Sequence, residues 1–259
     1  MPNLAPNPAP DHAPAPGPAP TTTDDLAEAA FGLADAGAEM AATGLNPVTL
    51  AIGTFDEDTP FEAWTHYPSG DARDTDSGLQ IYYHAHREDG EHGHFHVFLR
   101  AGDDAASLTS LLKEEPASKE DGAKDDGAED TKAAAAVPKP IVAKDLIHVV
   151  AITMDPLGLP VQLFTTNYWV TGEQMITAEQ LIPLLGRLRC SDAFEAPLAN
   201  RWFNDFFTLY RDDVAQLLHE RDAQLDKLGY PLEDREVEIL SSKNISILDK
   251  MDELGLLED

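Results

Sequence analysis

The chain is poor in cysteine, in basic residues and in long apolar runs, and each shortage excludes a class of protein. Its single cysteine, Cys190, excludes an internal disulfide framework and suits a reducing compartment. Only 18 Lys and Arg stand against 47 Asp and Glu, and the net charge of −29 argues against nucleic acid or an anionic membrane as partner. No apolar run approaches the roughly 18 residues that span a bilayer. Together these shortages predict a soluble, cytoplasmic protein.

Two segments lack the large apolar residues that a core needs. Residues 1–22 are rich in Pro and Ala and have neither a basic nor an apolar region of a signal peptide, so we expect a disordered tail. Residues 103–140 contain the charged stretch KEEPASKEDGAKDDGAEDTK and are expected to form a disordered acidic insertion. Either segment could contact a protein partner. The remainder, 23–102 and 141–259, is predicted to be a single domain, because strands on both sides of the insertion need partners.

The spacing of apolar residues predicts helices near both ends of this domain and strands between them. The first helix is expected to be capped by Thr23 or Asp24 and to end at Gly44. The strand-like stretches are residues 48–55, 61–68, the hairpin within 79–100, 146–154 and 161–169. After them, Thr177 and Gln180 form a capping box and helical patterns continue to the C-terminus. This order predicts an α+β fold, in which an antiparallel sheet with a His-rich β-hairpin packs one face on the N-terminal and C-terminal helices.

The segment YYHAHREDGEHGHFHVFLR (82–100) carries five of the nine histidines and allows two hairpin registers. A two-residue loop at Asp89-Gly90 would mix histidines and apolar side chains on both faces of the hairpin. A three-residue loop over 88–90 instead pairs Tyr83 with Phe95 and leaves one face continuously apolar, which favours this register. The other face then carries Tyr82 and five histidines: His84, His86, His92, His94 and His96.

Histidines this close predict a metal site. Opposed Cβ atoms in a hairpin lie about 4.5 to 5.5 Å apart, so His84, His86 and either His94 or His96 can converge on one ion. Imidazole ligands without thiolate suit a divalent transition metal, namely iron, zinc, copper or manganese. A hydrogen-bonded histidine network without metal and a polar, solvent-facing patch are the alternatives. Mutual repulsion of the rings once they are protonated favours the metal, which would hold them neutral.

Several other side chains are candidates for chemistry near such an ion. Glu91 and Asp71 are the acid/base candidates, and Tyr82 is a hydrogen-bond donor on the histidine-bearing face. Asp71 also lies in a loop rich in turn formers, SGDARDTDSG, where aspartates often bind their own backbone. The stretch FTTNYWVTGE offers polar groups that could line a pocket or cap a strand and helix: Thr165, Thr166, Asn167 and Glu173. His148 alternates with Val150 and Ile152, a pattern typical of a core histidine.

The hairpin resembles part of a known metal-site pattern. Gly78, His84, His86 and Glu91 have the spacing of the first cupin motif, G(X)5HXH(X)4E. Cupins are small β-barrels in which two histidines and a glutamate surround a metal. The resemblance implies these ligands: His84, His86, Glu91 and, as the fourth, His96 or His148. Phe98 stands where the motif's closing glycine belongs, and the second cupin motif is missing, so the likeness is one of site rather than of fold.

A resemblance that covers more of the chain rests on WTHYPSGDARDTDSG, YYHAHR, EHGHFHVFLR, HVVAITMDPLGLPVQLFTTNYWVTGE and RWFNDFFTLY. These stretches resemble a bacterial family defined as domain of unknown function 6969, over about residues 24 to 228. The resemblance implies one domain with a lineage-specific acidic insert, and it implies no activity.

The sequence therefore favours a metal-dependent enzyme, of oxygenase or hydrolase type, that acts on a small molecule. The alternatives are a non-catalytic metal- or ligand-binding interaction module and a scaffold without ligand. No GxSxG, HExxH, Walker-type or GxGxxG motif occurs in a convincing context, which disfavours Rossmann hydride transfer and P-loop phosphate chemistry.

Overall fold

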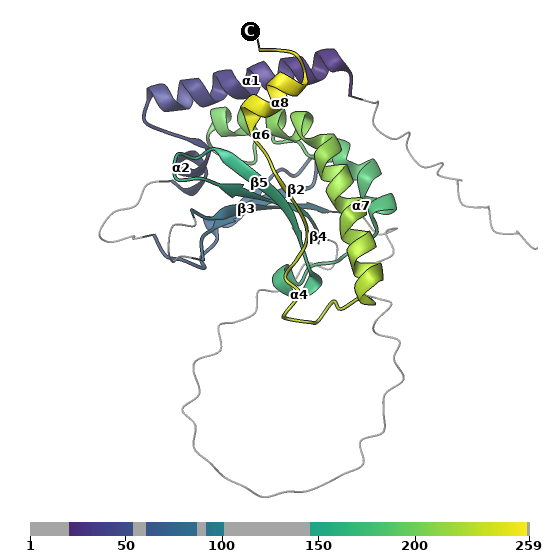
Figure 1. Ribbon diagram of the computed structural model, residues 1–259. Coiled ribbons are helices and arrows are strands. Elements are labelled where there is room, and N and C mark those ends of the chain that lie inside the picture. Colours follow the sequence, from purple (N-terminus) through teal and green to yellow (C-terminus); the bar gives the residue numbers. More distant parts are fainter. Residues whose placement is uncertain (1–20, 54–60, 87–91, 101–145, 258–259) are drawn as a thin grey trace, which may run out of the picture.

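The protein contains one six-stranded antiparallel sheet whose strands follow one another in chain order (Figure 1). The computed structural model describes residues 21–53, 61–86, 92–100 and 146–257. The strands are β1 (Tyr67–Arg73), β2 (Leu79–His84), β3 (His94–Arg100), β4 (Leu146–Met154), β5 (Pro160–Thr166) and β6 (Ile239–Asn244). The predicted insertion at 103–140, most of the predicted tail at 1–22, and Glu91 lie outside the described residues.

Most of the helices pack on one face of this sheet, as the sequence predicts. These are α1 (Thr23–Ala42), α2 (Pro47–Ile52), α5 (Ala178–Leu181), the 3-10 helix η2 (Ile182–Arg187), α6 (Pro197–Leu209), α7 (Arg211–Leu228) and α8 (Ile247–Glu253). The short helix α4 (Tyr168–Thr171) follows β5 and contributes no residue to this core. Apolar residues of β2 to β5 form one core with residues of α1, α6 and α7, for example where the ring of Phe203 meets that of Phe95 edge-on. The fold is therefore α+β. Among the described helices, none has the length and apolar character needed to cross a membrane.

The structure corrects two of the predicted strands near the N-terminus. Residues 47–52 form helix α2 instead of a strand, because Asn46 and Thr49 make a capping box and Pro47 occupies the first turn. Strand β1 begins only at Tyr67 and runs through the predicted loop to Arg73, paired with β2. The cap of α1 is Thr22, which exchanges hydrogen bonds with Asp25, rather than Thr23 or Asp24.

Farther along the chain the predictions agree better with the structure. Strand β4 has the predicted bounds, Leu146–Met154, and Thr177 with Gln180 caps α5. The helical pattern predicted toward the C-terminus includes the segment SSKNISILDKMDELG, which is divided between the end of β6 and helix α8. Its first residues are extended because Ser241 and Ser242 pair with β5 and complete the sheet.

Candidate metal centre

The hairpin has the register predicted from the apolar face. In β2 and β3, Ile81 pairs with Val97, Tyr83 with Phe95 and His84 with His94. The loop residues 87–91 lie outside the described part of the chain. Apolar residues of both strands enter the core under the helices. Tyr82, His84, His94 and His96 lie on the opposite side of the sheet, which we call the histidine face.

Ring nitrogens from four hairpin histidines meet on the histidine face. The Nε2 atom of His84 lies 3.0 Å from that of His94 and 3.1 Å from that of His86. The Nε2 atoms of His94 and His96 are also 3.0 Å apart. Three of these residues, His84, His86 and His94, offer ligand atoms that all lie within 4.8 Å of one another, so they could hold a metal ion.

The separations suit metal coordination. Two nitrogens that lie about 2.1 Å from one ion and at right angles are about 3.0 Å from each other. Each Nε2 atom carries either one N–H or one lone pair in the ring plane. The Nε2 atoms of His84 and His94 each contact two other ring nitrogens. A single N–H or lone pair forms only one well-aligned hydrogen bond, so hydrogen bonding alone does not account for both contacts. One cation could accept a lone pair from each of the three converging rings, His84, His86 and His94.

The structure separates His92 from this cluster and adds His148 to it. His92 precedes β3, and its backbone oxygen accepts a hydrogen bond from the Tyr83 hydroxyl. His92 is not one of the three residues that converge. His148 lies with Nε2 2.9 Å from Nδ1 of His96, and its own Nδ1 is 3.3 Å from the Thr166 hydroxyl. The contacts thus run from the hairpin across β4 to β5.

A β-bulge explains why alternation along β4 misplaced His148. Val97 pairs with Val150, but the next residue of β3, Phe98, pairs with His148, so Val149 is an extra residue in β4. Val149 and Val150 both enter the core, and His148 is thereby turned to the histidine face. His148 is buried with polar partners at both ring nitrogens, as expected of a core histidine, but because of this bulge it lies on the opposite face from Val150 and Ile152.

Desolvation keeps the imidazoles of His84, His96 and His148 neutral. Desolvation, aided by the neighbouring histidines, lowers the pKa of His84 to about 2 and that of His96 well below its usual value. Desolvation and the charge of Arg221 lower the pKa of His148 to about 3. A neutral imidazole is the form that binds a metal ion, so the ring of His84, one of the three converging residues, is held in the form that acts as a ligand.

An open pocket of about 580 Å³ borders the cluster. Its lining residues come from β2, from the segment before β1, from α4 and from the chain before β6. They include Trp64, His66, Tyr82, His84, His86, Trp169, Glu173, Glu233, Arg235 and Glu238. The rings of Trp64 and His86 stack with centroids 4.3 Å apart, and Arg235 lies over the ring of Trp169. The pocket is large enough for a small molecule.

Asp71 and Tyr82, both predicted as catalytic candidates, lie beside His66. The Nδ1 atom of His66 is 3.5 Å from an Asp71 carboxylate oxygen, and its ring stacks on Tyr82 with centroids 3.6 Å apart. The other Asp71 oxygen accepts a hydrogen bond from the Gln80 side chain. Burial raises the pKa of the Tyr82 phenol, which therefore stays protonated and can donate. The position of His66 against Tyr82 could not be predicted from the sequence, because residues 61–66 belong to no helix or strand.

The polar residues of FTTNYWVTGE have different roles. Asn167 caps α4 and binds the backbone oxygens of Pro231 and Val237, so it has a structural role. Thr165 contacts the Ser241 hydroxyl. Glu173 lines the large pocket and also a small cavity beside His148 and Thr166. Its Oε2 atom is buried and has no hydrogen-bond partner among the described residues.

Burial raises the pKa of the Glu173 carboxyl to about 7, so this group can exchange a proton near neutral pH. Because the folded pKa exceeds the usual 4.5, the folded state binds more protons than the unfolded state between those values, and stability falls as pH rises. Glu173→Gln should remove this loss. We expect the difference in unfolding free energy, variant minus unmodified protein, to increase by about 3 kcal/mol as the pH rises from 4.5 to 7.5.

Urea unfolding of both proteins across this pH range measures the difference. The matched control is Glu238→Gln, which removes an exposed carboxylate from the same pocket. A Glu173→Gln curve parallel to that of the unmodified protein at every pH would contradict the raised pKa.

Comparison with known proteins places the chain in a family. The family described as Domain of unknown function (DUF6969) matches residues 27–245. The match covers more than half of the chain, so the chain belongs to this family. Neither the curated proteins nor the solved structures yield a match.

Proposed function

We propose that this member of the DUF6969 family is a metal-dependent enzyme that acts on a small molecule, by an oxygenase- or hydrolase-type reaction. The observation that carries the proposal is the convergence of His84, His86 and His94 on one point beside an open pocket. Three protein ligands leave a coordination position free, which is typical of catalytic sites. The expected metal is divalent iron, zinc, copper or manganese.

The remaining histidines would position the ligands. His96 contacts His94 through Nε2 and His148 through Nδ1, and His148 in turn contacts Thr166. Such contacts fix the orientation and tautomer of ligating rings. His92 and Glu91 remain candidates from the sequence alone, since His92 stands apart from the cluster and Glu91 lies outside the described residues.

The pocket supplies groups for proton transfer and for binding. The ion would act as a Lewis acid or would activate oxygen. Glu173 would take up or release a proton at neutral pH, because its pKa is raised to about 7. The Tyr82 hydroxyl would donate a hydrogen bond, and Asp71 would orient His66. Trp64 and Trp169 would contact the apolar part of the substrate.

Plasma mass spectrometry of the untagged, full-length protein tests the proposal. We expect near-stoichiometric iron, zinc, copper or manganese, and loss of the metal in the double variant His84→Ala/His94→Ala. His219→Ala, which removes an exposed histidine on α7, is the control for histidine loss and should retain the metal. A protein that contains no metal and takes up none of the four ions when they are offered would refute the metal site.

The contact between His96 and His94 also supports the second candidate, a non-catalytic metal-binding module. If His96 were a fourth protein ligand, the ion would have no open position, as in structural or storage sites. The variant His96→Ala separates the two functions. An enzyme with three ligands should keep its metal in this variant with a loss of affinity of about 10- to 100-fold at most, because His96 then only orients His94, whereas a four-ligand binding site should no longer retain the ion.

A further inference from the structure

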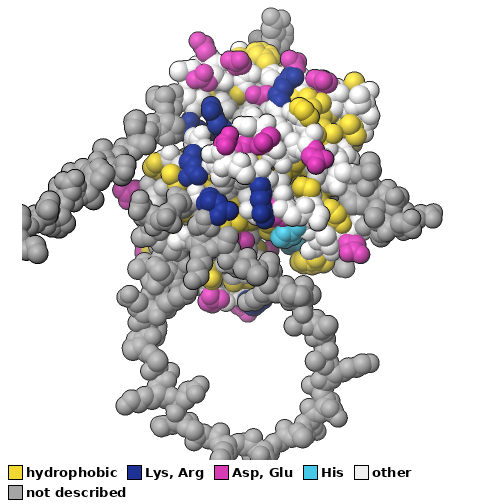
Figure 2. Space-filling model, turned by 180° about the vertical axis from the view of Figure 1, so that it is seen from behind, with side chains coloured by type: hydrophobic (Ala, Val, Ile, Leu, Met, Phe, Trp, Pro, Cys, Tyr) yellow, Lys and Arg dark blue, Asp and Glu magenta, His cyan; other side chains and the backbone are white. Residues whose placement is uncertain are grey.

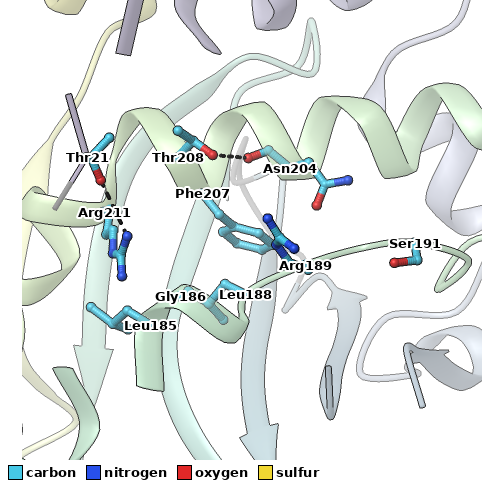
Figure 3. A pocket seen from close by; sticks show the side chains of 10 residues that line it. All are labelled: Thr21, Leu185, Gly186, Leu188, Arg189, Ser191, Asn204, Phe207, Thr208 and Arg211. Atoms are coloured by element: carbon cyan, nitrogen blue, oxygen red, sulfur yellow. Dashed lines mark hydrogen bonds between the residues drawn. The ribbon is translucent and has the colours of Figure 1, made fainter. Parts of the chain in front are cut away.

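A second pocket, of about 360 Å³, lies in the helical layer, away from the histidine face. One wall of the pocket is formed by η2 and the chain that follows it, and the other by residues of α6 and the start of α7 (Figure 3). Leu185, Leu188 and Phe207, which line the pocket, also belong to the core on the apolar side of the sheet. The sheet therefore separates this pocket from the candidate metal centre.

The pocket is basic in a protein that is strongly acidic. Arg189 and Arg211 line it, and none of the described residues that line it is Asp or Glu. The whole chain has 47 acidic residues against 18 basic ones, so two arginines without a lining carboxylate are unusual here. On the face seen in Figure 2, by contrast, Lys and Arg side chains are mixed with Asp and Glu side chains. Local positive charge within an acidic surface directs a small anion to that point.

The two guanidinium groups are available to a ligand. Arg211 makes a long hydrogen bond of 3.4 Å from Nη1 to the Thr21 hydroxyl, and no ion pair of Arg189 or Arg211 occurs among the described residues. In Figure 3 the Phe207 ring lies between the two arginine side chains. Arginine binds phosphate oxygens with two parallel N–H donors, so a phosphate group could be held from two sides.

The wall that carries Arg189 is fixed in place. The Ser77 hydroxyl donates a hydrogen bond to the backbone oxygen of Arg189, and the Ser191 N–H donates to Asp74. From the other side, the Asn204 amide exchanges two hydrogen bonds of 2.8 Å with the backbone of Cys190. A preformed wall lowers the entropic cost of binding.

We infer that this pocket binds the phosphate group of a small molecule, with Arg189 and Arg211 as its principal donors. Leu185, Leu188 and Phe207 would contact an apolar body attached to that phosphate. The net charge of −29 disfavours a polyanion such as nucleic acid, which would meet the acidic surface beyond the pocket. The inference is independent of the proposed metal chemistry.

Isothermal titration calorimetry of the full-length protein with inorganic phosphate and with phenyl phosphate tests the inference. We expect saturable binding that weakens at least tenfold in Arg189→Gln and in Arg211→Gln. Arg201→Gln is the matched control: this exposed arginine of α6 pairs with Glu39 outside the pocket, and its loss should leave the affinity unchanged. Tighter binding of phenyl phosphate would identify an organic phosphate as the ligand, and equal binding would identify free phosphate.

A phosphate could also bind to a metal ion in the other site. The titrations are therefore repeated with metal-free His84→Ala/His94→Ala protein, which should bind phosphate as the unmodified protein does. Failure of both phosphates to bind the folded protein would overturn the inference. Binding that survives both arginine substitutions, or that disappears with the two histidines, would overturn it as well.

Discussion

Metal-free protein is expected to lose about 5 kcal/mol of stability between pH 7 and pH 4.5, which is enough to unfold many domains. The cause is a set of three histidines, the half-buried His84 and the buried His96 and His148, whose pKa values are lowered in the folded state. Below their usual pKa of 6.5, these rings are protonated in the unfolded chain and neutral in the folded one. The unfolded state then binds more protons, so stability falls as pH falls, by about 1.4 kcal/mol per pH unit for each ring. Glu173, with its raised pKa, offsets part of this loss.

Urea unfolding of the chelator-treated protein between pH 4.5 and pH 8 provides the measurement. His148→Gln should reduce the net slope with pH by about half, because one of the three rings no longer contributes while Glu173 still offsets the contribution of another. His219→Gln, in which an exposed histidine is replaced, should have the slope of the unmodified protein. Equal stability of metal-free protein at pH 7 and pH 5 would show that the buried rings do not resist protonation.

Gly93→Ala should destabilise the protein by about 3 kcal/mol or more, because Gly93 stands where the chain enters the histidine-bearing strand β3. Its φ of +106° lies in the left-handed region. A Cβ atom added there would lie 2.5 Å from the backbone oxygen of His84 and 2.5 Å from the Tyr83 hydroxyl. Relief of this overlap must separate β2 from β3, so the variant should also bind metal more weakly.

Gly37→Ala is the matched control for that substitution. Gly37 lies within α1, where an added Cβ meets no atom within 4 Å, so the change should stabilise the protein by about 0.5 to 1 kcal/mol. Thermal unfolding and metal content are measured on both variants. A Gly93→Ala protein with unchanged melting temperature and metal content would show that the hairpin is not constrained at this residue.

The hairpin shows how much of the site could be read from the sequence. Its register depended on whether an apolar face remained continuous, and the pairing of Tyr83 with Phe95 confirmed that choice. Because neighbouring strands fix the distance between opposed side chains, the approach of His84 to His94 followed directly from the register. Local pairing thus made four of the five hairpin histidines predictable as neighbours.

The other features of the fold and of the candidate site depended on contacts between segments, which the sequence of one segment does not encode. One extra residue in β4, Val149, reversed the side of the sheet on which His148 lies. Residues 47–52 have strand-like composition, yet the cap at Asn46 made them helical. Glu173 reaches the pocket only because β4 and the chain after α4 meet, with Ile147 beside Gln174.

The pairing of Arg100 with Leu146 has a consequence for how this family can vary. These residues mark the two ends of the connection between β3 and β4, and paired strand residues lie only about 5 Å apart. Because both ends are held at neighbouring points, the connection can gain or lose many residues in the course of evolution while the strands it joins keep their places. The same pairing makes this point suitable for protein engineering, since a short turn, a foreign peptide or a new pair of chain ends introduced here would leave every histidine of the sheet on its original strand.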